Sequence, residues 1–309
     1  MAKSRKKKTK KRYSSWLVIV AALVIASFLH QTINGRKLPT FQQVTEQSQN
    51  VVQQATKLKE RITTNNESKA NSNEVKAPLT EQAFETPKNR PLDTRVMSRA
   101  GYTLSFNDEW LMPNWVAWQL TPERLMGKEK RTDEFTGDPN LPEHLRVEHR
   151  DYSRSGYDRG HMAPAADMKW DKLAMQESFY MSNICPQASN LNKGDWKELE
   201  EQCRKWTQNH HTTIYIACGP IVHPGEKHKR IGQGHKVIVP DGFFKVVLKL
   251  GKTPAAVGFI YPNDDCNAPM NHYAIPVDSV EALTGIDFFH LVPNELENVL
   301  EATNGFEKF

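Results

Sequence analysis

The chain has 309 residues, of which 38% are hydrophobic, 25% are charged and 9% are aromatic. A chain of this length and composition can bury a sizeable core, which excludes a peptide, a coiled coil and a wholly disordered protein. The formal net charge is +5, yet residues 1–12 contain eight Lys or Arg and no acid, whereas residues 93–309 contain 24 basic and 30 acidic residues. A domain folded from residues 93–309 is therefore acidic, so it can hold a polyanion only through a local basic cluster or a bound cation.

The N-terminal part is predicted to anchor the chain in a membrane. Residues 16–29, WLVIVAALVIASFL, carry no charge and follow the basic tail of residues 1–12. As a helix this run is about 21 Å long, or about 27 Å over residues 13–30, against a hydrocarbon core of about 30 Å. No small-residue cleavage site follows, so we expect residues 13–30 to be a single-pass anchor; if the segment were cleaved, the protein would be secreted. The basic tail before the anchor favours a catalytic or binding domain outside the cytoplasm.

Residues 31–92 are predicted to be a flexible linker, since they are rich in polar residues and their second half lacks hydrophobic periodicity. The remaining residues, 93–309, are expected to form the folded domain. They contain all four cysteines, which are Cys185, Cys203, Cys218 and Cys266. Three full disulfide pairings are open in an oxidising compartment, and buried free thiols are the alternative.

The domain alternates between strand and helix patterns. Strands are predicted at residues 115–121, 179–184, 212–218, 236–239, 243–250 and 255–261, and helices at residues 172–178, 192–209, 280–283 and 294–303. The turn Pro240-Asp241-Gly242 is predicted to join two strands as a hairpin. Most strands follow one another without a crossover helix, so we expect an α+β domain around an antiparallel sheet.

The longest predicted helix has one apolar stripe. Trp196, Leu199, Cys203 and Trp206 recur every three or four residues and are expected to face the core. Glu200 lies at the edge of this stripe, about 40° around the helix from Trp196. A half-buried carboxylate needs a partner, and an ion pair with an arginine is the simplest interpretation.

A candidate site lies in residues 157–168, YDRGHMAPAADM. Gly160 permits a close approach of the backbone, and His161 stands between Arg159 and a loop of small residues. A lone histidine in a loop is usually a surface residue, so the case for a site depends on its surroundings. About 30 residues later, Asn192 and the stripe that carries Glu200 follow in SNICPQASNLNKGDWKELEEQ.

Four nearby residues have structural interpretations. Asp158 and Asp167 are expected to accept hydrogen bonds that organise the loop rather than to bind metal. Trp115 and Trp118 are expected to lie in the core rather than to stack on bases.

Three consecutive motifs, DRGHMAPAADM, FYMSNICPQ and LNKGDWKELE, resemble the DNA/RNA non-specific endonuclease family. The likeness extends roughly from Trp115 to Phe289 and includes the segment Arg131–Asp138 and the motif LTGIDFF. The resemblance implies a ββα-metal (His-Me finger) core, in which a hairpin bears the histidine and the next helix supplies a metal ligand. It also implies metal-dependent, sugar-non-specific hydrolysis of phosphodiester bonds in DNA and RNA.

The resemblance assigns a role to each candidate residue. It makes His161 the general base that deprotonates water and Asn192 the protein ligand of Mg²⁺, with Mn²⁺ or another divalent cation as the alternative. Glu200 becomes the carboxylate that holds water molecules around the ion. Arg159 and Arg131 match the arginines that contact the phosphate.

These residue types suit the chemistry. A neutral imidazole, with an ordinary pKa near ~6.5, accepts a proton from water at neutral pH. Mg²⁺ prefers oxygen ligands, and guanidinium groups bind phosphate bidentately. None of these groups reads a base or a 2′-hydroxyl, so we expect cleavage of both DNA and RNA with weak sequence preference.

Two alternatives remain open at this stage. A catalytically silent, nuclease-like module could bind nucleic acid or a protein without cutting, although it has no need for both His161 and Asn192. The basic N-terminus could itself be the nucleic-acid binder. DNA, RNA and a membrane are the expected partners, and a second copy of the chain and a protein inhibitor are further candidates.

Overall fold

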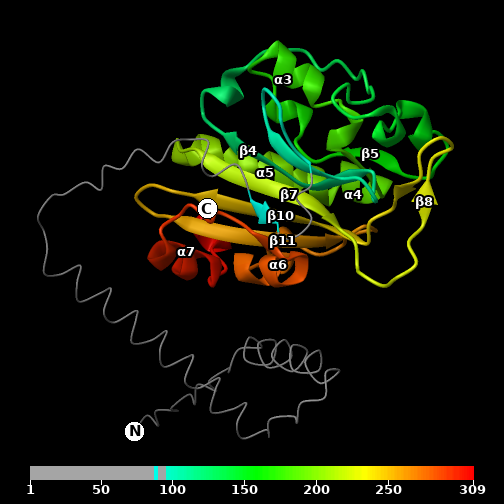
Figure 1. Cartoon of the computed structure of the whole chain (residues 1–309). Helices are drawn as coiled ribbons and strands as arrows, with labels where there is room; N and C mark the ends of the chain where they lie inside the picture. The colour runs from blue at the N-terminus through cyan, green and yellow to red at the C-terminus, as the bar shows by residue number, and fades with distance from the viewer. Residues whose placement is uncertain (1–86, 90–94) are drawn as a thin grey trace, which may run out of the picture. The chain divides into compact units, whose positions relative to one another are not determined.

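The computed structural model describes residues 87–89 and 95–309 (Figure 1). The basic tail (1–12), the anchor (13–30) and nearly all of the linker (31–92) lie outside the described residues, so these boundaries stay predictions. Within the described part of the chain, no helix is long and apolar enough to cross a membrane.

The centre of the domain is a seven-stranded sheet in which every neighbouring pair is antiparallel, in the order β12-β11-β10-β7-β4-β3-β2. In chain order the strands are β2 (Val96–Ser98), β3 (Thr103–Asn107), β4 (Met112–Leu120), β7 (Ile214–Ile221), β10 (Gly242–Lys249), β11 (Ala255–Pro262) and β12 (Ala274–Ile275). A mixed fold with a large antiparallel sheet is thus confirmed.

Helices cover both faces of this sheet. They are α5 (Asp195–His210) on one face, and α6 (Val277–Thr284) and α7 (Asn294–Glu301) on the other (Figure 1). Side chains along a strand point alternately to the two faces. On β10, Phe243 and Val247 therefore join the core under α5, whereas Phe244 and Val246 join the core under α6 and α7. Burial of both faces explains why this strand reads as an almost continuous apolar run.

The apolar stripe predicted for α5 is confirmed. Trp196, Leu199, Cys203 and Trp206 are each at most 3% exposed. Lys245 of β10 is also fully buried, and its Nζ lies 4.2 Å from the centroid of the Trp196 ring. The aromatic face therefore takes up a charge that has been removed from water.

A smaller hairpin lies beside the sheet. Strand β5 (Asp158–His161) pairs antiparallel with β6 (Ile184–Gln187). The chain then forms the short helix α4 (Ser189–Lys193) and continues into α5. The segment between the two strands contains α3 (Lys172–Glu177), where a helix is predicted at residues 172–178.

The strand predicted at residues 179–184 is wrong over most of its length. Met181–Asn183 is a turn of 3₁₀-helix, and β6 begins at Ile184. Asn183 is fully buried, and its side chain exchanges two hydrogen bonds of 2.9 Å with the backbone of Ala163. Asn183 therefore fastens this turn to the loop after β5, where a continuing strand was predicted.

The helix predicted from residue 192 is also wrong at its start. Asn192 lies in α4, and α5 begins only at Asp195. Gly194 separates the two helices with φ −105° and ψ −111°, a backbone conformation that glycine adopts readily. The break turns Asn192 away from the register of the α5 stripe.

The hairpin predicted at Pro240-Asp241-Gly242 is not formed. The preceding strand β9 (Val237–Ile238) pairs with β8 (Arg230–Ile231), whereas β10 pairs with β7 and β11. The Asp241 carboxylate accepts the backbone N–H of His223 at 2.8 Å and contacts His228 at 2.9 Å. These bonds hold the turn against the preceding loop instead of closing a hairpin.

Two expectations about side chains are settled by the fold. Trp115 and Trp118 are 0% and 1% exposed, so both belong to the core. All four cysteines are free thiols, so none of the three full disulfide pairings is formed. Short strands that the sequence analysis did not predict are β1 (Lys88–Asn89), β2, β3, β8, β12 and β13 (Ile286–Asp287).

A buried ion pair ties the edge of the sheet to the loop before the hairpin. Asp138 pairs with Arg99, and their side chains are 0% and 3% exposed. Asp138 also accepts hydrogen bonds from the Ser182 hydroxyl and, at 3.0 Å, from the backbone N–H of Asn140. The Asp138 carboxylate therefore joins the segment before β5 and the turn before β6 to the edge of the sheet at Arg99.

We predict that Asp138→Asn destabilises the domain by roughly 3–5 kcal/mol, because it leaves the buried guanidinium of Arg99 without its counter-charge. Urea unfolding measures the change. The matched control is Asp108→Asn, which breaks the exposed ion pair with Arg95 and should cost at most about 1 kcal/mol. Equal effects of the two substitutions would contradict the structural role of Asp138.

Candidate active site

All five residues assigned by the sequence analysis line one cavity of about 320 Å³. They are Arg131, Arg159, His161, Asn192 and Glu200. They come from the segment before the hairpin, from β5, from α4 and from α5. The structure thus brings together side chains that are up to 69 positions apart in the sequence, counted from 131 to 200.

His161 lies in an aromatic box. Its ring centroid is 5.3 Å from that of Phe135 and 4.9 Å from that of Phe179. Its Nε2 is buried and has no hydrogen-bond partner among the described residues. Burial, helped by the positive charge of Arg131, lowers the pKa of His161 from 6.5 to about 3. The imidazole is therefore neutral at neutral pH, with a ring nitrogen free of hydrogen bonds.

The backbone of β5 is fixed from both sides. A Cβ atom on Gly160 would lie 2.3 Å from the Oε1 of Gln187, so a side chain at this position would collide with the side chain of Gln187. On the other side, the indole N–H of Trp196 on α5 donates to the carbonyl oxygen of His161 at 3.4 Å. The close approach predicted for Gly160 is confirmed, and it sets the position of the histidine.

Asp158 joins the hairpin to α4. Its Oδ2 accepts hydrogen bonds of 3.1 Å from the Asn192 amide and from the Ser189 hydroxyl, and lies 3.1 Å from the Nζ of Lys193. Burial opposes ionisation of this carboxyl group, but the bonds from Asn192 and Lys193 outweigh it and lower the pKa of Asp158. Asp158 is a hydrogen-bond acceptor, as predicted. The amide nitrogen of Asn192 is engaged here, which leaves its amide oxygen free of this contact.

Glu200 does not form the arginine ion pair that was its simplest interpretation. Arg204, one turn further along α5, lies 2.8 Å from Asp167, which also accepts a 3.1 Å hydrogen bond from the indole of Trp118. Within the described residues, no salt bridge to Glu200 is formed. Burial raises the pKa of Glu200 to about 7, against the opposing charge of Lys245. A cation in the cavity would stabilise the ionised form of Glu200.

The two arginines reach the cavity across the same aromatic rings that enclose the histidine. The guanidinium of Arg131 lies 5.0 Å from the ring centroid of Phe179, and that of Arg159 lies 5.3 Å from the ring centroid of Phe135. Arg131 also contacts Asp133. The terminal nitrogen of Arg159 is 2.7 Å from Nε2 of His149. The imidazole and both guanidinium groups are thus positioned by one pair of phenylalanines.

The cavity is basic although the domain is acidic. The cations among its lining residues are Arg131, Arg159, Lys193, Lys197 and Arg204, and the only carboxylate among them is Glu200. Lys193, Lys197 and Arg204 were not predicted from the sequence. Lys197 and Arg204 lie three positions before and four positions after Glu200 on α5, so this spacing could have indicated them. Lys193 lies on α4, before the break at Gly194. The local cluster that polyanion binding requires is therefore present.

The donor set of the cavity fits a divalent cation that prefers oxygen. Asn192 and Glu200 line the same space and both have side-chain oxygens, and Mg²⁺ takes few protein oxygens and keeps several water molecules. A cavity of this volume has room for an ion with its water and for a phosphate group.

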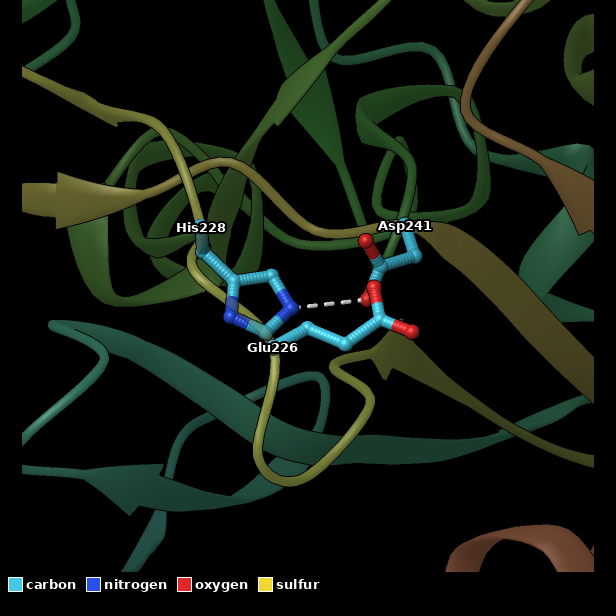
Figure 2. Close-up of side chains that lie close together, drawn as sticks. All are labelled: Glu226, His228 and Asp241. Carbon is cyan, nitrogen blue, oxygen red and sulfur yellow. Dashed lines mark hydrogen bonds and ion pairs between the residues drawn. The ribbon is translucent and has the colours of Figure 1, made fainter.

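A second group of metal-binding side chains lies away from this cavity. Figure 2 shows the imidazole of His228 directed at Asp241, with the carboxylate of Glu226 beside them. His228 Nε2 is 2.9 Å from Asp241 Oδ2. The two side chains bind each other, and Asp241 also accepts a hydrogen bond from the backbone of His223. These contacts hold the 222–229 loop in place, which accounts for the cluster without a metal.

The comparisons with known proteins agree with the geometry. The model of the family described as DNA/RNA non-specific endonuclease matches residues 79–295. The chain is 34% identical over 215 residues to mitochondrial endonuclease G of Bos taurus, covering 65% of this chain and 70% of that protein. It is 34% identical over 229 residues to a nuclease of Nostoc sp., covering 70% and 81%.

A solved structure extends the likeness to three dimensions. It is the crystal structure of the EndoG/EndoGI complex, which describes a mechanism of EndoG inhibition. Its TM-score against this chain is 0.61, and the two sequences are 27% identical. The match covers 72% of this chain and 95% of the other. The chain therefore belongs to the DNA/RNA non-specific endonuclease family, and it is a hydrolase that cleaves nucleic acids rather than a silent binding module.

Proposed function

We propose that the cavity is a ββα-metal active site that hydrolyses phosphodiester bonds of DNA and RNA. In this site His161 is the general base and Asn192 holds Mg²⁺, with Mn²⁺ as the alternative ion. The observation that carries the proposal is the convergence of a neutral, buried imidazole and of Asn192, Glu200 and two arginines on one cavity. The chain order β5, β6, α4 and α5 supports it, since the resemblance implies a hairpin followed by a ligand-bearing helix.

The first chemical requirement is a base that takes a proton from water. The imidazole of His161 is neutral and holds an unpartnered nitrogen, so it accepts that proton without first losing one. Phe135 and Phe179 fix the plane of the ring, which aims the base at a single position in the cavity.

The second requirement is to bind the phosphate and stabilise its charge. Arg131 and Arg159 present guanidinium groups to the cavity, and such groups bind phosphate oxygens in pairs. A bound divalent cation supplies charge neutralisation at the phosphate and at the departing oxygen. Asn192 and Glu200 supply the oxygen atoms around that ion. Lys193, Lys197 and Arg204 add positive charge that attracts the sugar-phosphate backbone of the substrate.

The substrate preference follows from these contacts. Every assigned side chain is directed at phosphate, water or metal, and contacts with the phosphate backbone carry no sequence information. The enzyme is therefore expected to cut DNA and RNA with weak sequence preference.

We also propose a cellular location for the enzyme. Residues 13–30 anchor the chain in a membrane as a single pass, with the nuclease domain outside the cytoplasm, or the domain is secreted after cleavage. A protein inhibitor that covers the basic cavity is a candidate partner, and the inhibited complex of the structural relative supports that class of partner. A homodimer is a further candidate.

We predict that the ring of His161 stays neutral from about pH 8 to about pH 5 in the folded enzyme. Its pKa is lowered in the native state, so the unfolded chain takes up the proton first and this residue reduces stability as the pH falls below ~6.5. The ring C–H resonances of His161 in NMR spectra recorded in the presence of a chelator report its protonation. They are assigned by comparison with the spectrum of His161→Gln. A titration midpoint of the ring near ~6.5 would contradict the effect of the aromatic box.

We predict that His161→Ala lowers turnover at least ~10²-fold on both plasmid DNA and RNA, because the water loses its proton acceptor. The assay uses the purified full-length chain in Mg²⁺, and EDTA should abolish cleavage by the wild type. His272→Ala, at an exposed histidine in the turn before β12, is the matched control and should cut normally. A wild type that leaves both substrates intact in Mg²⁺ would sink the proposed function; normal cutting by His161→Ala would instead remove only the assigned base.

We predict that Asn192→Ala raises the Mg²⁺ concentration needed for half-maximal cleavage, since the variant lacks the amide oxygen proposed to hold the ion. A metal titration of the cleavage rate measures this shift. Asn190→Ala is the control on the same helix, because its side chain bonds to Asp265 and does not line the cavity. Identical Mg²⁺ titrations of wild type and Asn192→Ala would rule out Asn192 as the ligand.

A further inference from the structure

Three carboxylates meet on the face of the sheet opposite the active site. They are Asp278 and Glu281 of α6 and Glu301, the last residue of α7. One oxygen from each of the three lies within 4.8 Å of the others. Two oxygens that bind one Ca²⁺ at 2.3–2.6 Å can be at most about 5.2 Å apart, so the three are close enough to share one ion.

Glu301 differs from an ordinary surface carboxylate in its burial and in its hydrogen bonding. It is only 6% exposed, and its Oε1 is buried without a hydrogen-bond partner in the described part of the chain. A buried, unsatisfied carboxylate oxygen costs free energy unless a proton or a cation compensates it. Glu281 has one oxygen engaged, since its Oε1 accepts the backbone N–H of Phe288 at 2.7 Å.

The surroundings of Glu301 are acidic. Burial, followed by the charges of Glu281, Glu297 and Asp278, raises the pKa of Glu301 to about 9. Within the described residues, no lysine, arginine or histidine forms an ion pair with Asp278, Glu281 or Glu301. In the absence of a cation the carboxyl group of Glu301 is therefore protonated at neutral pH. The group combines an unsatisfied buried oxygen with an open side, because Asp278 is exposed.

We propose that Asp278, Glu281 and Glu301 form a Ca²⁺ site that fastens α7 to α6. The ligands are oxygen atoms from three carboxylates, and the exposed side at Asp278 admits the water molecules that complete a coordination shell of six to eight. Ca²⁺ is favoured over Mg²⁺ because it tolerates irregular, carboxylate-rich shells, whereas Mg²⁺ demands near-octahedral geometry. Zn²⁺ is disfavoured, because none of the three ligands is a histidine or a cysteine.

The site would act on the stability of the C-terminal part rather than on catalysis. Val280 of α6 and Leu300 of α7, each next to a ligand in the sequence, are buried in the core on this face of the sheet. An ion that joins the two helices therefore holds both of these apolar contacts in place. Because the site and the nuclease cavity lie on opposite faces of the sheet, the proposal is independent of the proposed catalytic residues.

The test is the thermal unfolding of the full-length chain, first stripped with EDTA and then titrated with Ca²⁺. Wild-type Tm should rise by roughly 5 °C at a Ca²⁺ concentration about 100 times Kd. Glu301→Gln keeps the shape of the side chain but cannot ionise, so it should fold without metal and lose the Ca²⁺-dependent rise. Asp278→Asn, at the exposed ligand, should weaken the response. Glu295→Gln, an exposed acid on the same helix, should keep the full response.

Ca²⁺ in the nuclease cavity could also raise Tm, so Asn192→Ala is measured in parallel. A rise that persists in Asn192→Ala and disappears in Glu301→Gln supports the new site, and isothermal titration calorimetry should then count one Ca²⁺ fewer per chain for Glu301→Gln. A rise of equal size in wild type and Glu301→Gln, or no rise in either, would overturn the proposal. Cleavage by Glu301→Gln in Mg²⁺ is expected to match the wild type, which separates this result from any failure of the catalytic proposal.

Discussion

One carboxylate oxygen holds the two halves of the active site together. Oδ2 of Asp158, three positions before His161, receives hydrogen bonds from Ser189 and Asn192 and the charge of Lys193, all on α4. The strand that carries His161 and the helix that carries Asn192 are thereby joined at one point. The same bond orients the amide of Asn192, because it engages the nitrogen and leaves the oxygen for the cavity.

The electrostatics of the domain follow from where charges are placed rather than from their total. Residues 93–309 contain more acidic than basic residues, yet the cavity is lined by five cations and one carboxylate. Phe135 and Phe179 allow this arrangement, because each ring contacts the ring of His161, Phe135 at a tilt and Phe179 edge to face, and each also contacts an arginine. Cation–π contact holds both guanidinium groups near the imidazole, and of the two, Arg131 also pairs with an exposed carboxylate, that of Asp133.

Patterns with a regular period could be predicted from the sequence, whereas features set by single side chains could not. The stripe of α5 and the strands β7, β10 and β11 follow from apolar periodicity, which burial enforces along a whole element. The turn at Asn183 and the break at Gly194 each depend on one residue whose neighbours read as regular structure. The assigned residues share a cavity, but only the resemblance connected Arg131 with it, since no local pattern places a loop arginine against a distant phenylalanine.

Burial acts in opposite directions on the two titratable groups proposed for the mechanism, and both effects favour the neutral form. It lowers the pKa of His161 to about 3 and raises that of Glu200 to about 7. Beside a divalent cation the carboxyl group of Glu200 would ionise, because an opposite charge favours the anion. The same positive charge would keep the ring of His161 neutral, and it would also make the ring a weaker base. The poorly compensated carboxyl group of Glu200 would thus be stabilised as an anion by the kind of ion that oxygen atoms of this site are suited to bind.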